Sequence, residues 1–487
     1  METSALHTDF YQLTMMQGYY KEGKAQQRVV FDLFFRQNPG GNGFAIVAGL
    51  EQVIEYIQNI HFSSDDIDYL RSLNMFDEDF LATLRNFRFH GDLYAIPEGT
   101  VVFPNEPLLR VEASIFEAQL LETALLNIVN HQTLIATKAA RIVKAADGKP
   151  VLEFGSRRAQ GMDAALYGAR AAIIGGCEAT SNTLAGKRFG IPVRGTHAHS
   201  WVLSFPSELE AFRAYARAFP DSCLLLVDTY DTIRSGLPNA IQVAKELKEK
   251  GHRFLGIRLD SGDLAYLSKV ARKMLDEAGF PDAIIVASSD LNEEVIADLR
   301  LQGAKIDVYG VGTSLITSED CPSLGGVYKL AAEEHQGKMV PKIKISENTR
   351  KITTPGIKQV TRIYLPSGMA TADLIHLEDE SVDESKPLEL FDPVDTWKRK
   401  TVRRFTARPL LVPVFKNGEL VYDSPSVMEI QRYAKQDLAT FSEEIKRLIN
   451  PHTYHVDLSP ALWELKNSLI HERRSALQVT LNGEETE

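Results

Sequence analysis

The sequence has few cysteines and no long apolar run. Its three cysteines, Cys177, Cys223 and Cys321, lie far apart, so they form neither the paired spacing of a zinc site nor a disulfide framework. Nowhere do about 18 apolar residues follow one another. Residues 1–13 also lack the basic and apolar regions of a secretory signal. These absences predict a reduced, cytoplasmic protein without a membrane segment.

An excess of basic charge is missing as well. The 487 residues include 54 Lys and Arg against 65 Asp and Glu, which gives a net charge of -11. A surface that binds nucleic acid mainly through phosphates needs the opposite balance. We therefore expect no nucleic-acid partner, and any anionic ligand must be held by a local basic cluster.

From residue 150 onward, short apolar runs alternate with helical patterns. Each run ends in polar or glycine residues, as at 151–154, 171–174, 223–227, 254–259, 284–287 and 306–309. Such alternation predicts parallel strands with helical crossovers. We predict an α/β fold whose catalytic domain, 136–362, is an incomplete or irregular TIM-like barrel. The competing open doubly wound sheet is disfavoured because no Gly-x-Gly-x-x-Gly opens the first helix.

The flanking segments follow other patterns. Residues 1–135 combine a strand-like run and short β segments with a long helix over 115–145. Residues 363–487 are irregular, with a hairpin at 410–422 and helical patterns at 438–449 and 460–473. We expect the two segments to form an α+β, β-rich domain packed with the barrel.

Acidic residues follow several of the predicted strands, among them Asp228, Asp231, Asp260 and Asp290. The carboxyl ends of parallel strands meet at one face, where α/β proteins bind ligands. An acidic face of this kind suits a magnesium ion or the hydroxyls of a sugar. For any single Asp, a helix N-cap or a turn is the competing interpretation.

Positive charge is concentrated in residues 329–362. This segment holds three acids against eight basic residues: Lys329, Lys338, Lys342, Lys344, Arg350, Lys351, Lys358 and Arg362. Lys and Arg donate charge-assisted hydrogen bonds to anionic oxygens, so the segment is a candidate phosphate clamp. A solvated hairpin face is the alternative. Glycine-rich turns at 310–313 and 325–326 could bind a second phosphate. The basic segment and these turns together predict a ligand that is a sugar with phosphates at both ends.

Two histidines, His197 and His199, stand one residue apart on a turn that begins at Gly195. An imidazole nitrogen exposed on such a turn can form a covalent intermediate. A loop histidine that only hydrogen-bonds its own turn is the competing interpretation.

Five motifs in order resemble nicotinate phosphoribosyltransferases: Thr8-Asp9-Phe10-Tyr11, Glu153-Phe154-Gly155-Ser156-Arg157-Arg158-Ala159-Gln160-Gly161, Gly195-Thr196-His197-Ala198-His199-Ser200, Arg258-Leu259-Asp260-Ser261-Gly262-Asp263, and Lys344-Ile345-Ser346 through Lys351, Pro355-Gly356 and Lys358. The resemblance implies a homodimer with shared active sites and an incomplete barrel packed on a β-rich domain. It implies transfer of phosphoribosyl from phosphoribosyl pyrophosphate to nicotinate, the first step of NAD salvage from nicotinate. It also implies Mg2+ and ATP, whose hydrolysis is coupled through a phosphohistidine.

The same resemblance implies roles for individual residues. His199 matches the phosphorylated histidine, and Asp231 or Asp228 would orient its ring. Phe154, with Tyr11 of the partner subunit, would sandwich the pyridine ring. The remaining roles are carried by sets of residues: Arg157 and Arg258 for the nicotinate carboxylate or an adjacent phosphate; Asp260 for ribose hydroxyls; Gly310, Gly312 and Gly326 for the 5'-phosphate; Lys329, Lys344 and Lys351 for pyrophosphate or ATP; and Asp9, Thr196 and Ser261 for further substrate contacts.

Two other functions remain open on this sequence. A nicotinamide phosphoribosyltransferase would need an acid to accept the amide N–H, whereas the pair Arg157-Arg158 favours an anion. A catalytically silent phosphosugar-binding barrel would bind ligands without turnover. The role of Glu178, which departs from the expected family pattern, is also open.

Overall fold

The computed structural model of the chain describes residues 4–348 and 351–484. By their internal contacts the residues divide into two compact units. Unit 1 comprises residues 1–133, 323–425 and 433–487, and unit 2 comprises 134–322 and 426–432. Residues 323–362, which the sequence-based division places with the barrel, thus fall in unit 1. Among the described residues, no helix is both long and apolar enough to cross a membrane.

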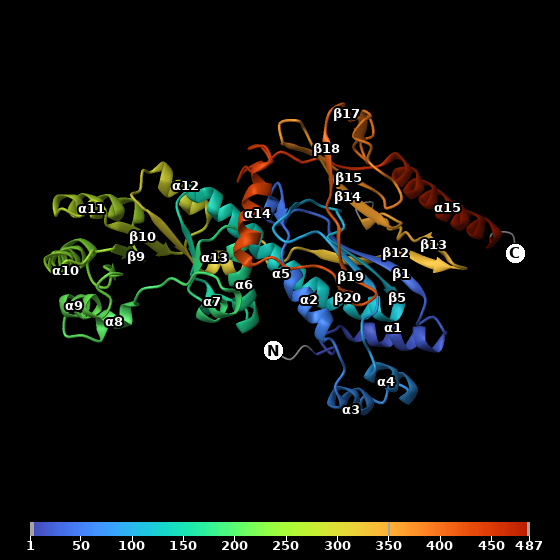
Figure 1. Cartoon of the computed structure of the whole chain (residues 1–487), viewed down its shortest axis with the longest axis horizontal. Coiled ribbons are helices and arrows are strands. Elements are labelled where there is room, and N and C mark those ends of the chain that lie inside the picture. The colour runs from blue at the N-terminus through green and yellow to red at the C-terminus, as the bar shows by residue number, and fades with distance from the viewer. Residues whose placement is uncertain (1–3, 349–350, 485–487) are drawn as a thin grey trace. The chain divides into compact units, whose positions relative to one another are not determined.

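Unit 2 is built on a six-stranded parallel sheet with the order β7-β6-β11-β10-β9-β8. The strands are β6 (Val151–Glu153), β7 (Ala179–Thr180), β8 (Leu224–Leu226), β9 (Gly256–Leu259), β10 (Ile284–Ser289) and β11 (Val308–Val311). The crossovers include α10 (Leu237–Glu249), α11 (Leu264–Glu277) and α12 (Glu293–Leu301), and α11 packs beside β9 and β10 (Figure 1). The predicted alternation of parallel strands and helices is therefore confirmed.

This sheet is not a closed barrel. Its end strands, β7 and β8, each pair with only one neighbouring strand in the described part of the chain. The mixed α/β class of the prediction is confirmed, whereas closure into a barrel is not found in residues 4–348 and 351–484.

One predicted strand is wrong. Residues 171–174 form the last turn of helix α6 (Met162–Ile174). Gly175 follows directly, and a Cβ atom there would lie 2.2 Å from the carbonyl oxygen of Ala136. A glycine therefore ends the helix where it approaches a neighbouring backbone closely.

The remaining helices of unit 2 are short. They are α7 (Thr183–Phe189), α8 (His199–Leu203), α9 (Glu208–Ala218) and α13 (Thr313–Ile316), with single turns η2 (Ser156–Arg158) and η3 (Thr232–Gly236). Two of them, η2 and α8, begin within the sequence motifs that carry the candidate site residues.

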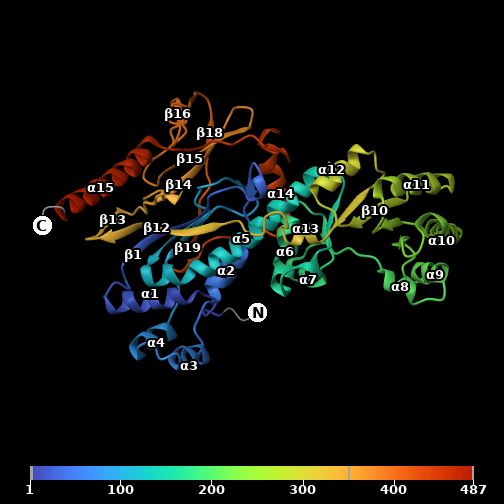
Figure 2. The same cartoon turned by 180° about the vertical axis from the view of Figure 1, so that it is seen from behind.

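Unit 1 contains a seven-stranded antiparallel sheet with the order β13-β12-β1-β5-β3-β19-β20. Its strands are β1 (Arg28–Phe35), β3 (Asp92–Ala95), β5 (Leu109–Ser114), β12 (Gly326–His335), β13 (Lys338–Pro341), β19 (Val412–Lys416) and β20 (Glu419–Leu420). β1 lies between β5 and β12, so the sheet joins the first segment of the chain to residues about 300 positions later. Figure 2 shows β12 beside β1.

Helices accompany this sheet in the N-terminal segment. They are α1 (Phe10–Lys21), α2 (Leu50–Asn59), α3 (Ser64–Ser72), α4 (Glu78–Arg85) and α5 (Ile115–Ala146), with the turn η1 (Pro39–Gly41) and the short strands β2 (Ala45–Ile46) and β4 (Val101–Val102). The apolar faces of α2 and α4 are buried in the same core as Leu33 and Phe35 of β1. The predicted long helix over 115–145 is confirmed by α5.

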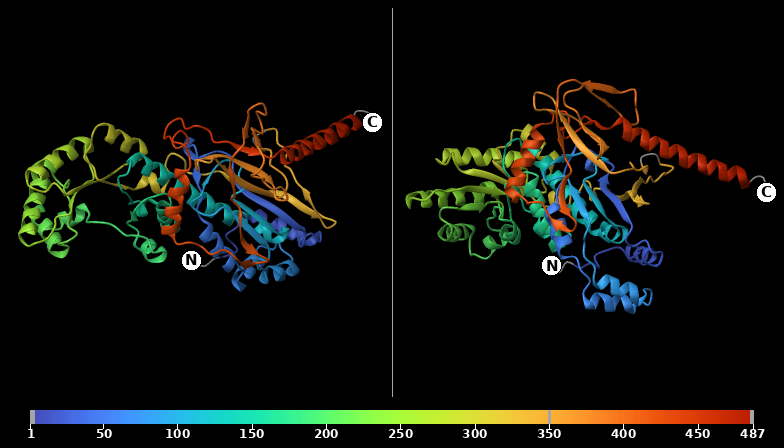
Figure 3. Two further views of the ribbon diagram at one scale, coloured as in Figure 1. Left: turned by 45° about the horizontal axis from the view of Figure 1, so that its top comes forward. Right: turned by 45° about the vertical axis from the view of Figure 1, so that its right-hand side comes forward.

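The C-terminal segment adds a four-stranded sheet with the order β18-β14-β15-β21 to unit 1. These strands are β14 (Lys358–Tyr364), β15 (Ala370–Leu377), β18 (Thr406–Pro409) and β21 (Val456–Leu458). A hairpin, β16 (Leu388–Phe391) with β17 (Arg399–Val402), and helix α15 (Pro460–Glu484) complete the segment (Figure 3).

The helix predicted at 438–449 is wrong, because α14 spans Val427–Ala439 and ends where that prediction begins. Ser426 and Glu429 form a reciprocal pair of hydrogen bonds that fixes the start of this helix. This arrangement is a capping box, which the pattern Ser-x-x-Glu indicates in the sequence.

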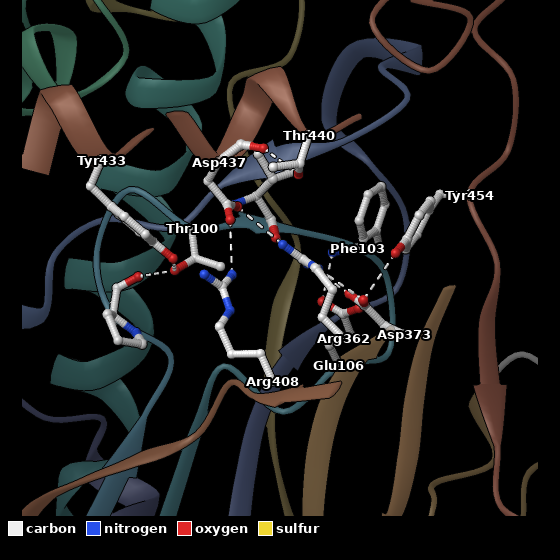
Figure 4. Close-up of polar contacts among 12 residues, drawn as sticks. Thr100, Phe103, Glu106, Arg362, Asp373, Arg408, Tyr433, Asp437, Thr440 and Tyr454 are labelled. Carbon is white, nitrogen blue, oxygen red and sulfur yellow. Dashed lines mark hydrogen bonds and ion pairs between the residues drawn. The ribbon is translucent and has the colours of Figure 1, made fainter. Parts of the chain in front are cut away.

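A cluster of four ionic side chains joins strands of the C-terminal sheet, and we call Arg362, Asp373, Arg408 and Asp437 the ionic cluster (Figure 4). Three of them are buried, whereas Arg408 is 39% exposed. Arg362 donates two hydrogen bonds to Asp373, at 2.8 and 2.7 Å, and one to Asp437 at 3.0 Å. Arg408 donates to the other oxygen of Asp437 at 2.8 Å. Burial and the nearby Asp373 raise the pKa of Glu106 well above its usual range.

Candidate active site

A cavity of about 530 Å3 lies within unit 2, at the carboxyl ends of the parallel strands. Its walls come from the segments that follow β6, β7, β9, β10 and β11 and from the loop before α8. The lining residues are Phe154, Arg157, Arg158, Ser181, Gly195, Thr196, His197, Ala198, His199, Arg258, Asp260, Ser288, Ser289, Asp290, Gly310, Gly312 and Thr313. The position agrees with the general location of ligand sites in parallel α/β sheets.

An aromatic ring enters this cavity from the turn after β6. The backbone N–H of Phe154 donates to the carbonyl oxygen of Val311 at 2.8 Å, which fixes the start of the turn against β11. The ring rests on Gly310, where an added Cβ atom would lie only 2.6 Å from Cδ2 of Phe154. Gly310 therefore makes room for the ring, and half-buried Phe154 can present one face to a flat ligand.

His199 contacts a buried carboxylate. Its Nε2 lies 3.2 Å from Oδ1 of Asp228, whose side chain is 2% exposed, whereas His199 itself is 39% exposed. The second oxygen of Asp228 accepts hydrogen bonds from the backbone N–H of Asp260, at 3.1 Å, and from the hydroxyl of Ser261, at 2.5 Å. Because a carboxylate only accepts, Nε2 of His199 carries a hydrogen in this contact, and in the neutral ring Nδ1 keeps the lone pair.

Asp231, the other predicted partner of His199, makes different contacts. Its Oδ1 accepts the backbone N–H groups of Ile233, at 3.0 Å, and Arg234, at 2.8 Å. It thus caps the turn η3, which is the ordinary role of an Asp that precedes a helix. Of the two alternatives drawn from the sequence, the structure places Asp228 beside His199.

Arg258 on β9 supports the loop that carries the histidines. Its guanidinium donates to Oγ1 of Thr196 at 2.9 Å and to the carbonyl oxygen of His197 at 3.0 Å. Burial lowers its pKa, but an arginine remains charged at any ordinary pH. Arg258 therefore brings a positive charge to the cavity wall, beside the exposed Arg157 and Arg158 of η2.

Acidic side chains also line this cavity, after β9 and β10. Asp260 follows β9, and its Oδ1 accepts a hydrogen bond of 2.5 Å from Ser288 of β10. Asp290 follows β10 and is exposed. Among residues 4–348 and 351–484, no group of three or more His, Cys, Asp and Glu side chains could hold a metal ion alone.

Six predicted site residues belong to unit 1: Asp9, Tyr11, Gly326, Lys329, Lys344 and Lys351. Asp9 accepts a hydrogen bond of 2.8 Å from Thr123. Tyr11 is 48% exposed on α1, and burial together with Glu122 and Asp9 raises its pKa to about 12. At Gly326, an added Cβ atom would lie 2.1 Å from Oδ1 of Asn130, so a larger residue here would displace that side chain.

The basic segment 329–362 has a mixed role. Lys358 is buried in an ion pair of 2.6 Å with Asp32, and Arg362 belongs to the ionic cluster. Lys342 pairs with Glu333 at 2.6 Å. For these three residues the structure gives partners within the fold. Lys329 is half-buried, and burial with the charges of Lys344 and Arg36 lowers its pKa. Arg350 lies outside the described residues.

Sequence reasoning missed Ser181 as a site residue because it placed a strand at 171–174. The true strand, β7, ends at Thr180, and Ser181 follows it into the cavity. The two glycines at 175 and 176 are the signal that could have marked a helix end before β7.

Three family models match the chain one after another. They are the nicotinate phosphoribosyltransferase N-terminal domain over residues 6–130, the nicotinate phosphoribosyltransferase family over 150–358 and the nicotinate phosphoribosyltransferase C-terminal domain over 357–466. The chain belongs to the nicotinate phosphoribosyltransferase family. It is an enzyme of that type.

Individual members of the nicotinate phosphoribosyltransferase family match almost the whole chain. The nicotinate phosphoribosyltransferase of Bacillus subtilis is 53% identical over 99% of this chain and 98% of its own length. The human enzyme of the same name is 36% identical over 95% of this chain and 96% of its own. The crystal structure of human nicotinic acid phosphoribosyltransferase superposes with a TM-score of 0.86 at 35% identity, and it covers 95% of this chain and 99% of that one.

Proposed function

We propose that this enzyme transfers the phosphoribosyl group of phosphoribosyl pyrophosphate to nicotinate, forming nicotinate mononucleotide and pyrophosphate. The observation that carries the proposal is the cavity of unit 2. In a chain of this family, it combines the ring of Phe154 with the cations of Arg157 and Arg258 and the carboxylate of Asp260. An aromatic anion and a phosphosugar need these groups together.

The reaction needs little proton transfer. The ring nitrogen of nicotinate carries a lone pair and attacks C1 of the ribose, while the bond from C1 to the pyrophosphate oxygen breaks. Phe154 would hold the ring plane, and Arg157 or Arg258 would bind the carboxylate. Asp260, oriented by Ser288, would accept hydrogen bonds from ribose hydroxyls. Arginines also stabilise negative charge that develops on the leaving group.

We further propose that ATP hydrolysis is coupled through His199. Nδ1 is the nitrogen with the available lone pair, so it would attack the γ-phosphorus of ATP as the bond to ADP breaks. Asp228 would stabilise the positive charge that develops on the ring, because its buried carboxylate lies 3.2 Å from Nε2. Water would later cleave the phosphorus–nitrogen bond and release phosphate.

Mg2+ would enter with the substrates' phosphates. Protein sites for this ion often supply one or two carboxylates beside substrate phosphates, and Asp260 and Asp290 line the cavity. The ion would neutralise charge on the pyrophosphate. As a further part of the proposal, a second copy of the chain would contribute the exposed Tyr11 to the pyridine site in a homodimer with shared sites.

Intact mass and product analysis test the function. Incubation with Mg2+ and ATP should add one phosphate to the peptide that contains His199, and nicotinate with phosphoribosyl pyrophosphate should discharge it. His199→Ala should lose the label. His252→Ala is the matched control, because His252 is about as exposed as His199 and pairs at 2.8 Å with an aspartate, Asp221, that is exposed and not buried.

Each outcome has a distinct meaning. Pyrophosphate release without any label would retain the transferase and reject the coupling. Neither label nor nicotinate mononucleotide would reject the proposed function. Nicotinamide in place of nicotinate should give far less product, and equal turnover of both would reject the assignment of arginines to the carboxylate.

A further inference from the structure

The two histidines of the Gly195 loop differ in burial and in the groups that they contact. His199 is half-buried and faces Asp228, whereas His197 is only 8% exposed. The ring of His197 meets that of Tyr215 edge-on, with centroids 4.7 Å apart. Burial lowers the pKa of His197 to about 4, so its ring is neutral at neutral pH and keeps one acceptor nitrogen.

That acceptor faces a backbone group at the edge of the parallel sheet. Nε2 of His197 lies 3.3 Å from the backbone nitrogen of Leu226 in β8. β8 pairs only with β9, and the next residue, Val227, donates its N–H toward that side, to the carbonyl oxygen of Arg258. Because N–H groups alternate in direction along a strand, the N–H of Leu226 points away from β9.

A buried edge N–H without a partner is costly. The imidazole of His197 therefore accepts the N–H of Leu226 in place of the carbonyl oxygen that a further strand would supply. It also ties the loop to β8, while Arg258 holds the same loop from β9 through Thr196 and the carbonyl of His197. Two residues after His197, the chain enters α8 with His199.

We propose that His197 is a positioning residue, which fixes His199 opposite Asp228 by accepting the edge N–H of Leu226. The proposal rests on the proposed function only in that His199 is the group to be positioned. It assigns separate tasks to the two histidines. One is a neutral acceptor within the fold, and the other carries the chemistry.

A pair of variants separates this role from mere packing. His197→Gln keeps an acceptor oxygen near the position of Nε2, whereas His197→Leu keeps apolar volume without an acceptor. Phe212→Leu is the control for packing. The ring centroid of Phe212 lies 6.3 Å from that of His197, and an apolar phenyl side chain cannot hydrogen-bond to the loop.

Amide hydrogen exchange, resolved to single residues, measures the hydrogen bond between Leu226 and His197 and needs no substrate. We expect the Leu226 amide to exchange up to about tenfold faster in His197→Leu, as loss of one hydrogen bond allows. The Val227 amide, which is bonded to Arg258, should change much less. His197→Gln and Phe212→Leu should both leave the Leu226 amide protected.

The position and reactivity of His199 provide the second measurement. In His197→Leu, crystals should show His199 displaced from Asp228, and its labelling by ATP should slow, with both restored in His197→Gln. Unchanged exchange at Leu226, or faster exchange with His199 still in place, would overturn the proposal. If the wild-type protein takes no phosphate, the coupling fails, while exchange and crystal positions still decide the role of His197.

Discussion

Two aspartates three residues apart, Asp228 and Asp231, have separate tasks in the structure. We predict that Asp228→Asn slows phosphate transfer to His199 by about 100-fold, because the amide carries no negative charge to stabilise the ring and only one of its two polar atoms can accept the hydrogen bonds that Asp228 now accepts on both oxygens. Asp231→Asn should retain labelling, since an amide oxygen can still cap η3. Rapid-quench labelling with ATP measures both, and equal losses in the two variants would contradict the assignment.

The buried His197 should make stability depend on pH. Its pKa is about 4 in the folded chain and 6.5 ordinarily, so below pH 6.5 the unfolded chain binds a proton that the folded chain does not. Stability is therefore complete above pH 6.5 and falls toward pH 4, by an amount on the order of 3 kcal/mol. Desolvation is the main cause, and the nearby Arg258 and His199 act in the same direction.

Urea unfolding between pH 4 and pH 8 checks this prediction. His131 and His455 also have lowered pKa values, for which burial is the first cause. The wild-type slope therefore contains their contributions too. His197→Gln removes the contribution of His197 alone, so the free energy of unfolding should depend less steeply on pH in this variant than in the wild type. An unchanged slope would mean that His197 does not titrate as described.

Single residues could be predicted from the sequence where a motif surrounds them, as for His199, Phe154 and Arg258, which line one cavity. The choice between Asp228 and Asp231 could not, because both follow the same strand and only the fold of the loop decides which one meets His199. The contact of His197 with Leu226 could not be predicted either, because it is made by the backbone N–H of Leu226 and does not depend on which side chain stands there.

At the scale of elements, a buried carboxylate joins the turn after β6 to β7. Glu153 accepts a hydrogen bond of 2.5 Å from the hydroxyl of Thr180 and another from the backbone N–H of Gly155. Thr180 in turn bonds through its backbone to Pro192 and Arg194, just before the loop of the histidines. Glu153 thereby connects the turn that carries Phe154 with the strand that leads into that loop.

We predict that Thr180→Val lowers the free energy of unfolding by about 1–3 kcal/mol, because it leaves a buried carboxylate oxygen without its donor. The KM for nicotinate should also rise, since the turn with Phe154 and Arg157 loses a fixed contact. Thr180→Ser keeps the hydroxyl and is the matched control. Urea unfolding and steady-state kinetics measure the effects, and equal behaviour of Val and Ser would contradict them.

Elements with a clear period were predictable, including five of the six strands predicted in unit 2 and the long helix α5. The errors lie where apolar composition does not distinguish a helix from a strand. Residues 171–174 are apolar in either state, and only the length of the preceding helical pattern identifies α6. At 438–449 the error lay in missing the capping box at Ser426.

At the scale of the whole molecule, the ionic cluster ties together residues from distant parts of the sequence. Arg362 is fully buried between Asp373 and Asp437 and also donates to the carbonyl oxygen of Val101 (Figure 4). We predict that Asp437→Ala destabilises unit 1 by about 3–5 kcal/mol, because it removes one of the two carboxylates that pair with the buried Arg362 and the acceptor of the buried Val101 backbone N–H.

The control is a pair on the surface. Asp395 and Lys398 are each about half exposed, at 47% and 45%, so Asp395→Ala should cost no more than about 1 kcal/mol. Thermal unfolding of both variants provides the comparison. A loss at Asp437 as small as that at Asp395 would mean that the buried cluster adds no more than a surface contact.

The way β1 pairs has a consequence for the order in which the chain is made. β1 lies between β5, which is synthesised soon after it, and β12, which follows only after all but the last few residues of unit 2. Residues 134–322 are contiguous and can begin to fold as they leave the ribosome. Until β12 is made, β1 pairs only with β5, and its other edge stays unpaired. The unpaired edge exposes the nascent chain to aggregation until residues 326–335 are made, by which point the residues that line the cavity of unit 2 have already been synthesised.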